Sequence, residues 1–252
     1  MSTVGGDDFP ALRFLDLSFE TPAENLAFDE AMLDHVEEGL APHTLRLWES
    51  PVRFVVLGSA QVLHREVDAD VCAAEGVPVM RRCTAGGCVL QGPGSLNYSL
   101  ALGYNAFAAA RDLHGSYCHI LGRLARALAA RGMGPTHEGI CDLAVNGMKV
   151  SGNAQRRKRN AFLHHGTLLY RADHEGMEKF LREPGNRPEY RGERKHRDFV
   201  GALPATPGAI RSAVCEAFQA VLPAAVPLPS ELGAMRRLVA EKYLDHTWIG
   251  RK

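Results

Sequence analysis

The spacing of hydrophobic residues predicts a strand and then a helix near the start of the chain. Residues 13–17 alternate between polar and apolar side chains, as strands do. The segment Thr21-Pro-Ala-Glu24 has the form of a helix start, in which threonine caps, proline fits the first turn and glutamate completes a capping box. We expect this helix to continue to about Glu38 and to stop at Gly39.

The same two periodicities predict the remaining secondary structure. In chain order they give short strands at 45–48 and 54–57, a short helix at 69–75, strands at 77–80 and 96–102, a long amphipathic helix at 116–130, a strand at 162–170, two or three helices after it, and a final segment at 242–248. Strands and helices mix without strict alternation. We therefore expect an α+β fold with a largely antiparallel, mixed sheet flanked by helices.

A hairpin is the clearest local prediction, because Asn146-Gly147 joins two short runs and suits a type I′ turn. A two-residue turn fixes the register. The expected pairs are Val145 with Met148, Ala144 with Lys149, Leu143 with Val150 and Asp142 with Ser151. One face then carries Lys149, Ser151, Ala144 and Asp142, and the other, apolar face carries Met148, Val150, Leu143, Val145 and Cys141. A lysine placed diagonally from a carboxylate can polarise a carbonyl or hold a phosphate; the alternative is a paired surface lysine.

A glycine-rich segment, Arg81 to Gly92, follows a predicted strand. Glycines let backbone N–H groups approach an anion, and paired arginines add charge and forked donors. The segment is neither a P-loop nor GxGxxG. The alternative is a glycine-rich connection with a solvated arginine pair.

Two other polar runs have plainer explanations. The basic run 156–159 is typical of a solvated loop, although it can also dock an acidic partner or a phosphate. His164 and His165 are adjacent in a strand and should point to opposite faces, so they cannot bind one metal. We predict no metal site.

Composition narrows the class of protein. The 252 residues, 46% of them hydrophobic, suffice for one large core or one core with a small appendage. Lysine plus arginine equals aspartate plus glutamate at 29 each, so no net field attracts nucleic acid or a membrane surface. The six scattered cysteines form no CxxC pair, which disfavours zinc and a disulfide framework.

No apolar run is long enough to span a bilayer, and Met1 to Pro10 lacks the layout of a signal peptide, so we expect a cytoplasmic location.

These motifs, in this order, resemble the lipoate–protein ligase and octanoyltransferase superfamily, whose catalytic domain is related to biotin–protein ligase. The likeness covers about residues 12–222, which we expect to be the catalytic domain, with 223–252 as a C-terminal helical tail. The matching segments are Asn25 to Glu30, Gly58 to Gln61, Arg81 to Gly92 with Leu96 to Ser99, Lys149 to Gln155, and His164 to Leu168.

The resemblance implies roles for individual residues. Lys149 is expected to be the catalytic side chain, in contact with the acyl carbonyl and the phosphate. A cation at a reacting carbonyl typically contributes about 3 kcal/mol to transition-state stabilisation. The expected binding residues for substrate or acyl-adenylate are Arg82, Gly86, Gly87, Cys88, Val89, Leu90, Asp142, Ser151, His165, Gly166 and Thr167.

The leading hypothesis is a lipoate–protein ligase. Such an enzyme activates lipoate or octanoate with ATP and Mg²⁺ as an acyl-adenylate, has no tightly bound cofactor, and modifies a lysine of a lipoyl domain or glycine-cleavage H protein. Two departures matter: the family's glycine triplet reads Ala85-Gly86-Gly87, and we expect the extra C-terminal domain of many ligases to be lacking, because the sequence ends soon after Trp248. A separate accessory subunit is compatible with the latter. The alternatives are an ATP-independent transferase that takes the acyl group from a donor such as acyl carrier protein onto a cysteine, and a non-catalytic lipoyl-binding subunit.

Cys141 is the candidate nucleophile under the transferase hypothesis. It lies eight residues before Lys149, a shorter spacing than expected for such transferases. The hairpin register also places it on the apolar face, away from Lys149, unless a bulge or strand end intervenes. We therefore predict a structural role for Cys141. Cys83 and Cys88 are weaker candidates, because burial without charge raises the pKa of a thiol and makes it inert.

Overall fold

The computed structural model describes residues 9–251. The expectation about a signal peptide therefore falls largely outside the described residues. The main strands are β1 (Leu12–Asp16), β2 (Thr44–Trp48), β6 (Ser95–Gly103), β7 (Thr136–Glu138), β8 (Asp142–Val145), β9 (Met148–Arg157), β10 (Ala161–Leu169) and β11 (Ala220–Val221). A smaller sheet contains β3 (Phe54–Leu57), β4 (Val79–Arg81) and β5 (Val89–Gln91).

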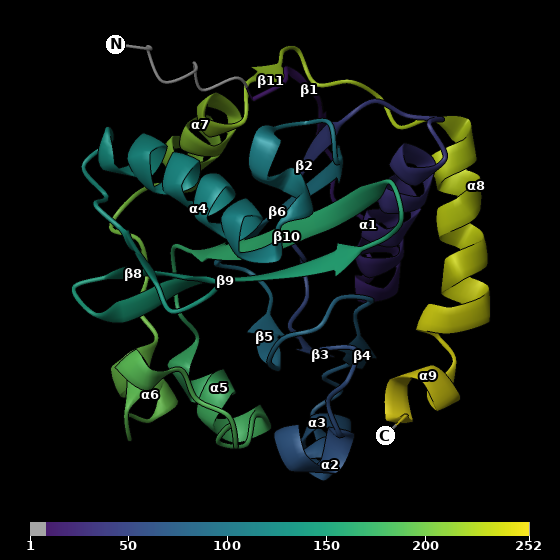
Figure 1. Ribbon diagram of the computed structural model, residues 1–252. Coiled ribbons are helices and arrows are strands. Elements are labelled where there is room, and N and C mark those ends of the chain that lie inside the picture. Colours follow the sequence, from purple (N-terminus) through teal and green to yellow (C-terminus); the bar gives the residue numbers. More distant parts are fainter. Residues whose placement is uncertain (1–8, 252) are drawn as a thin grey trace.

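The helices surround these sheets (Figure 1). They are α1 (Pro22–Glu37), α2 (Leu63–Glu66), α3 (Ala69–Ala74), α4 (Leu113–Ala129), α5 (His174–Phe180), α6 (His196–Phe199), α7 (Pro207–Ala217), α8 (Pro229–Leu238) and α9 (His246–Gly250). The short 3-10 helices η1 (Ala108–Arg111) and η2 (Glu189–Arg191) and the π-helix η3 (Val239–Tyr243) complete the set. No helix within residues 9–251 has the length and apolar character that crossing a membrane requires.

The large sheet has the order β11-β1-β2-β6-β10-β9-β8-β7. It is parallel from β11 to β2 and antiparallel from β2 to β7, which confirms the predicted mixed, largely antiparallel sheet. Helices α4 and α7 pack on one face, and α1 and α8 on the other (Figure 1). A third cluster joins the small sheet to α5 and α6. The flanking helices thus follow from two apolar sheet faces that both require cover.

The first helix forms as its sequence predicts. The Thr21 hydroxyl accepts a hydrogen bond from the Glu24 N–H at 3.2 Å, and the Glu24 carboxylate accepts one from the Thr21 N–H at 3.2 Å. Gly39 follows the helix end with a φ of 72°, the left-handed region that favours glycine. Helix α4, in contrast, starts at Leu113, before the predicted residue 116, because the Asp112 carboxylate caps it by accepting from Gly115 N–H.

The hairpin has the predicted turn but not the whole predicted register. Val145 pairs with Met148 and Ala144 with Lys149, as expected. The register then shifts between Leu143 and Ala144, so that Leu143 pairs with Ser151 and Asp142 with Gly152. The predicted pairs Leu143–Val150 and Asp142–Ser151 are therefore wrong. A bulge adds one residue to β9 and re-aims the side chains beyond it.

The segment from residue 223 onward, predicted as a helical tail, is helical in α8, η3 and α9. Met235 and Tyr243 are buried in the core that α1 contributes to, and the Tyr243 hydroxyl donates to the Glu30 carboxylate at 2.7 Å. The division of the chain at residue 222 stays a prediction. The segment nevertheless packs as part of the same hydrophobic core as α1.

Candidate active site

A cavity of about 140 Å³ lies between the glycine-rich segment and the strands β9 and β10. Of the predicted binding residues, it brings together Arg82, Gly86, Gly87, Cys88, Val89, Asp142, Lys149, His165, Gly166 and Thr167. Leu26, Trp48, Val56 and Ala154 add apolar wall, and Gln91, Asn97, Cys141, Gly152 and Asn153 complete the lining. An apolar wall next to a few convergent polar groups is the usual form of a small-molecule site.

Lys149 and Cys141 meet at one carboxylate in this cavity. The Lys149 Nζ lies 2.8 Å from Asp142 Oδ1, and the Cys141 Sγ lies 3.7 Å from the same oxygen. The prediction that Cys141 faces away from Lys149 is therefore wrong. Strand β8 begins at Asp142, so Cys141 lies in the turn before it, where the alternation on which the prediction rested no longer applies. A thiol, a carboxylate and an ammonium group thus share one end of the cavity.

Two further side chains hold this carboxylate and thiol in place. The Tyr190 hydroxyl donates to Asp142 Oδ2 at 2.9 Å, and the Asn153 amide donates to the Cys141 carbonyl at 2.8 Å. Gly152 gives Lys149 room, because a Cβ there would lie 2.9 Å from its Nζ. The sequence did not single out Tyr190, since it is far from Asp142 along the chain.

Two of the predicted binding residues lie outside the cavity. Ser151 falls beyond the bulge, where its hydroxyl accepts a hydrogen bond from the Asn153 amide at 3.2 Å on the side of the buried Tyr98. It does not share a face with Lys149 as predicted. Leu90 packs with the small sheet and lines a neighbouring cavity instead.

Arg82 holds the backbone of the glycine-rich loop in its conformation. This buried guanidinium donates to the carbonyls of Ala85 at 2.7 Å and Gly87 at 2.9 Å, and to the Thr84 hydroxyl at 2.9 Å. Gly86 has a φ of 95°, so the left-handed residue of the loop is a glycine and the alanine at position 85 is not strained. Arg82 therefore acts on the loop backbone, in addition to lining the cavity.

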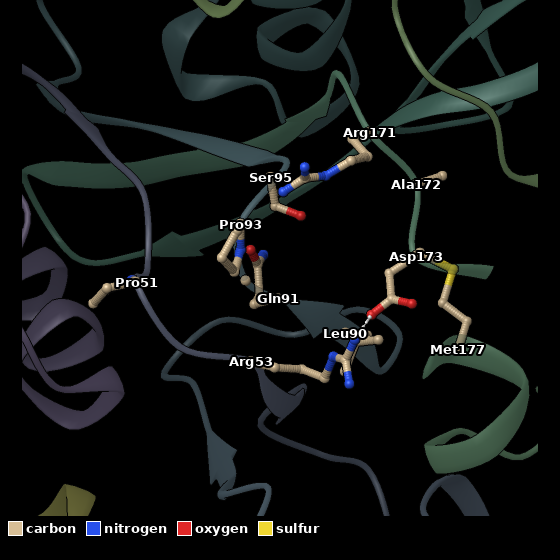
Figure 2. A pocket seen from close by; sticks show the side chains of 11 residues that line it. Pro51, Arg53, Leu90, Gln91, Pro93, Ser95, Arg171, Ala172, Asp173 and Met177 are labelled. Carbon is tan, nitrogen blue, oxygen red and sulfur yellow. Dashed lines mark ion pairs between the residues drawn. The ribbon is translucent and has the colours of Figure 1, made fainter. Parts of the chain in front are cut away.

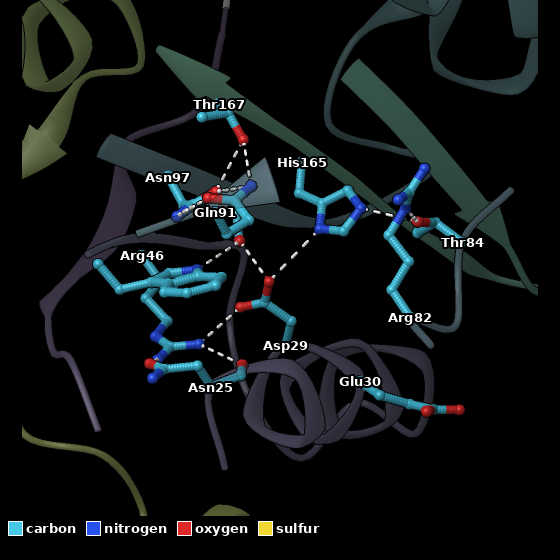
Figure 3. A network of polar contacts seen from close by, with 12 residues as sticks. Asn25, Asp29, Glu30, Arg46, Arg82, Thr84, Gln91, Asn97, His165 and Thr167 are labelled. Atoms are coloured by element: carbon cyan, nitrogen blue, oxygen red, sulfur yellow. Dashed lines mark hydrogen bonds and ion pairs between the residues drawn. The ribbon is translucent and has the colours of Figure 1, made fainter. Parts of the chain in front are cut away.

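A chain of polar contacts runs beneath the loop (Figure 3). The Thr84 hydroxyl lies 2.7 Å from His165 Nε2, and His165 Nδ1 lies 3.5 Å from Asp29 Oδ2. The Ser99 hydroxyl donates to the same oxygen at 2.7 Å, while Arg46 holds Oδ1 at 2.7 Å. Burial opposes ionisation of Asp29, but Arg46 and His165 outweigh it and lower the pKa of this carboxyl. The chain links α1 to the loop through His165.

The adjacent histidines point to opposite faces, as predicted. His165 lines the cavity, whereas His164 is buried between the Tyr98 hydroxyl at 3.1 Å and the Gln155 amide at 3.1 Å. Burial lowers the pKa of His164 to about 3, so it stays neutral. It is a core residue.

The thiols of the loop are unsuited to chemistry. Burial raises the pKa of Cys83 and of Cys88 to about 12 in each case. Since the thiolate is the reactive form, both are inert at neutral pH, as expected. Burial and then Asp142 raise the pKa of Cys141 as well, but Lys149 opposes them. Arg82 likewise opposes burial at Cys88, and Arg156 and Lys242 oppose it at Cys83, yet both pKa values stay at about 12. Of these three thiols, Cys141 is the one that shares a carboxylate, Asp142, with Lys149.

The basic run packs on the protein body. The Arg156 guanidinium donates to the Cys83 carbonyl at 3.1 Å, and Lys158 pairs with Asp34 at 2.6 Å. Arg157 lies over the rings of Tyr104 and Phe162, 5.0 Å and 4.9 Å from their centroids. These contacts favour a structural role for the run over the docking of an acidic partner.

A second, larger depression of about 460 Å³ borders the cavity and shares Gln91 with it. Figure 2 shows Arg53 and Asp173 paired across it, with Arg171 and Ser95 opposite. The Gln91 amide donates to Asn97 at 3.0 Å and to Thr167 at 2.7 Å, which fixes the wall between the two spaces. The Lys149 cavity brings a thiol, a carboxylate and an ammonium group together, so it is the candidate active site of the two.

Alkylation of Cys141 is expected to speed up about tenfold per pH unit between about pH 7 and about pH 9, because its raised pKa leaves little thiolate at neutral pH. Asp142→Asn should speed alkylation, since the charge and hydrogen bond of Asp142 both raise this pKa, and Lys149→Ala should slow it. Iodoacetamide labelling followed by peptide mass measures the rate, with exposed Cys118 as the internal reference. Slower labelling in Asp142→Asn would contradict this electrostatic account.

Tyr190→Phe is expected to lower the steady-state rate of the reaction at this cavity about fivefold to tenfold. The Asp142 carboxylate loses its 2.9 Å donor and with it the orientation of Lys149. Steady-state rates measure the effect. Tyr104→Phe is the matched control, because its hydroxyl donates to the Lys158 carbonyl and lies outside the cavity lining. Equal rates in both variants would show that Asp142 needs no such donor.

Comparison with known proteins gives a consistent result. The model of the lipoyl protein ligase A/B catalytic domain matches residues 21–222. The chain is 32% identical to the octanoyltransferase LipM of Kyrpidia tusciae, over 95% of this chain and 98% of that protein. It is 33% identical to a putative lipoate-protein ligase A of Aeropyrum pernix, over 61% and 55% respectively.

Solved structures share the fold. Lipoate-protein ligase A bound with ATP superposes with a TM-score of 0.83 at 22% identity, covering 96% of this chain and 99% of that one. The bi-partite lipoate protein ligase of Thermoplasma acidophilum, solved in a study that includes its E2 lipoyl domain, gives 0.81 at 22% identity, covering 96% and 98%. The predicted fold class is thereby confirmed.

Proposed function

Because the chain belongs to the lipoyl protein ligase A/B catalytic domain family, we propose that it is an acyltransferase that carries an octanoyl or lipoyl group as a thioester on Cys141. The acyl group would then pass to a lysine of a lipoyl domain or H protein. The observation that supports this most is the convergence of Cys141 Sγ and Lys149 Nζ on Asp142 Oδ1, at 3.7 Å and 2.8 Å. The name of the Kyrpidia tusciae relative, which matches over nearly the whole chain, agrees with it.

The first step forms the acyl-enzyme. The donor is an acyl carrier protein thioester, whose alkyl chain would lie against Leu26, Trp48 and Val56. Cys141 passes its proton to Asp142 and its sulfur attacks the carbonyl carbon. The donor carbon–sulfur bond breaks, and the leaving thiolate takes the proton from Asp142. The Lys149 ammonium stabilises the negative charge on the carbonyl oxygen as it develops.

The second step transfers the acyl group to the acceptor. The neutral amine of the acceptor lysine attacks the thioester carbonyl, an amide bond forms, and the bond from carbon to Cys141 sulfur breaks. The amine gives up a proton, which returns to the Cys141 sulfur through Asp142. Enzyme thiol and carboxylate are regenerated, so the cycle needs neither ATP nor a redox partner.

A lipoate–protein ligase is the second candidate. The spacing of eight residues between Cys141 and Lys149 is short for a transferase, and the Aeropyrum pernix relative is named a putative lipoate-protein ligase A. In this case ATP and Mg²⁺ would be co-substrates, and Lys149 would contact the phosphate of an acyl-adenylate beneath the glycine-rich loop. The non-catalytic hypothesis has no comparable support, since both relatives are named as enzymes.

The two candidates are separated by the fate of the enzyme thiol. Octanoyl-loaded acyl carrier protein is mixed with the protein, and the intact mass is recorded before and after hydroxylamine. A transferase gains one hydroxylamine-labile acyl group and modifies an apo-lipoyl domain without ATP. Cys141→Ala should lose both, whereas the exposed control Cys118→Ala should keep them. An active Cys141→Ala enzyme that makes AMP from lipoate and ATP would overturn the transferase proposal and support the ligase.

A further inference from the structure

Arg81 is a buried residue of β4 that connects two segments distant in sequence. Its guanidinium donates to the carbonyls of Gly58 at 2.9 Å and Gln61 at 2.7 Å on one side. On the other side it donates to the carbonyls of Ile249 at 2.8 Å and Arg251 at 2.9 Å. Among the described residues, every hydrogen bond that the guanidinium donates goes to a main-chain carbonyl oxygen. Arg81 therefore holds the backbones of the two segments together.

The C-terminal residues return these contacts. The Trp248 indole N–H donates to the Arg81 carbonyl at 3.0 Å, and Arg251 Nη2 donates to the Ser59 carbonyl at 2.7 Å. The Arg251 guanidinium also lies over the Trp248 ring, 3.9 Å from its centroid. We call residues 246–251 the C-terminal clasp.

The segment that the clasp holds is in contact with the glycine-rich loop. The Ser59 N–H donates to the Thr84 carbonyl at 2.8 Å. Gly58 lies against Gly86 so closely that a Cβ on residue 58 would come within 2.0 Å of the Gly86 carbonyl oxygen. Since Gly86 lines the cavity, a displacement of residues 58–61 would shift the cavity wall.

An arginine is required at this position. Its planar fork can donate in several directions at once and stays charged, even though burial lowers its pKa. The carbonyls at the C-terminal end of α9 carry partial negative charge and favour a nearby cation. A lysine offers one compact ammonium and cannot span both segments.

We propose that the C-terminal clasp, acting through Arg81 as a positioning residue, holds residues 58–61 and the glycine-rich loop in the shape that binds the acyl group. This inference rests on the proposed function in that the Lys149 cavity is taken to bind an octanoyl or lipoyl chain. The clasp acts on the loop side of the cavity, through Arg81 and Ser59, whereas Lys149 comes from β9 and Cys141 from the turn before β8. Loosening the clasp therefore weakens acyl binding and spares the thiol.

The test uses the full chain with three variants: Arg81→Lys, Trp248→Phe and Arg251→Ala. We expect KM for octanoyl-loaded acyl carrier protein to rise about tenfold in Arg81→Lys and less in the other two, while kcat changes less than about twofold. Hydrogen–deuterium exchange should rise in residues 58–61 and 84–88. The rate of Cys141 alkylation should stay within about twofold of wild type. Arg237→Ala, an exposed α8 residue, is the control.

The outcomes separate the two proposals. Wild-type protein that gains no acyl group and turns over no octanoyl donor would defeat the proposed function. Hydrogen–deuterium exchange in the variants would then decide by itself whether the clasp holds the loop. Active wild type with unchanged KM and exchange in all three variants would overturn the clasp. If Arg81→Lys fails to fold, Trp248→Phe and Arg251→Ala decide, because each removes a contact at the surface end of the clasp and leaves Arg81 in place.

Discussion

Lys149→Ala is expected to lower the rate of acyl transfer by about 10²- to 10³-fold, the loss typical when one charged or hydrogen-bonding group at a developing oxyanion is removed. The Lys149 ammonium lies at the cavity, 2.8 Å from Asp142 Oδ1, with 27% of its side chain exposed. It can therefore reach a substrate carbonyl without leaving its partner. The measurement is a single-turnover assay of amide formation on an apo-lipoyl domain.

Lys158→Ala is the control for this experiment. Lys158 also pairs with a carboxylate, that of Asp34 at 2.6 Å, and its side chain is exposed to a similar extent, at 28%. Its loss should leave transfer within about twofold of wild type. The thermal stability of both variants should remain close to wild type, because Tyr190 still donates to Asp142 when Lys149 is absent. A transfer rate near wild type in Lys149→Ala would remove the lysine from both the transferase and the ligase mechanism.

Asp29→Ala is expected to lower the free energy of unfolding by about 3–5 kcal/mol, because it leaves the guanidinium of Arg46 buried without its carboxylate. Arg46 has no exposed surface, and its Nη1 lies 2.7 Å from Asp29 Oδ1. Its remaining contacts are the carbonyls of Leu17 and Asn25, the Asn25 amide oxygen, and three aromatic rings. Urea denaturation followed by far-ultraviolet circular dichroism measures the loss.

Asp16→Ala provides the contrast for Asp29→Ala. Asp16 pairs with Arg211 at 2.6 Å, but 49% of its side chain is exposed. Solvent screens such a pair, so the change should stay below about 1 kcal/mol. If both variants lost a similar amount of unfolding free energy, burial would not be the reason that the Arg46–Asp29 pair stabilises the fold.

Local signals explain why much of the fold was predictable. Each long element carries its own start and stop, as in the capping box at Thr21 and the left-handed glycine at position 39. The strands predicted at 96–102 and 162–170 correspond to β6 and β10. Strands β5, β7 and β11 are two or three residues long and were not predicted. Such segments are too short to show a period and exist because a neighbouring strand pairs with them.

The candidate site was predictable only where its residues form continuous motifs. Arg82, Gly86 and Lys149 stand in such motifs and do line the cavity. The apolar wall from Trp48 and Val56 and the donor from Tyr190 come from segments that lie far away in sequence. Only the fold brings them to the cavity, because contacts between distant segments depend on how sheets and helices pack.

The hairpin marks the boundary between sequence and tertiary structure most clearly. The sequence by itself determined the Asn146-Gly147 turn, since few residues other than asparagine and glycine accept its positive φ angles of 50° and 74°. It also determined the first two cross-strand pairs. Tertiary structure decided the bulge after them, where Gly201 N–H donates to the Lys149 carbonyl at 2.8 Å while Val150 and Leu143 are both buried in the core. The extra residue in β9 turns Ser151 away from Lys149, to the face where it pairs with Leu143. Cys141 precedes the first residue of β8, so strand alternation does not fix its direction, and the fold places it at the cavity with Lys149.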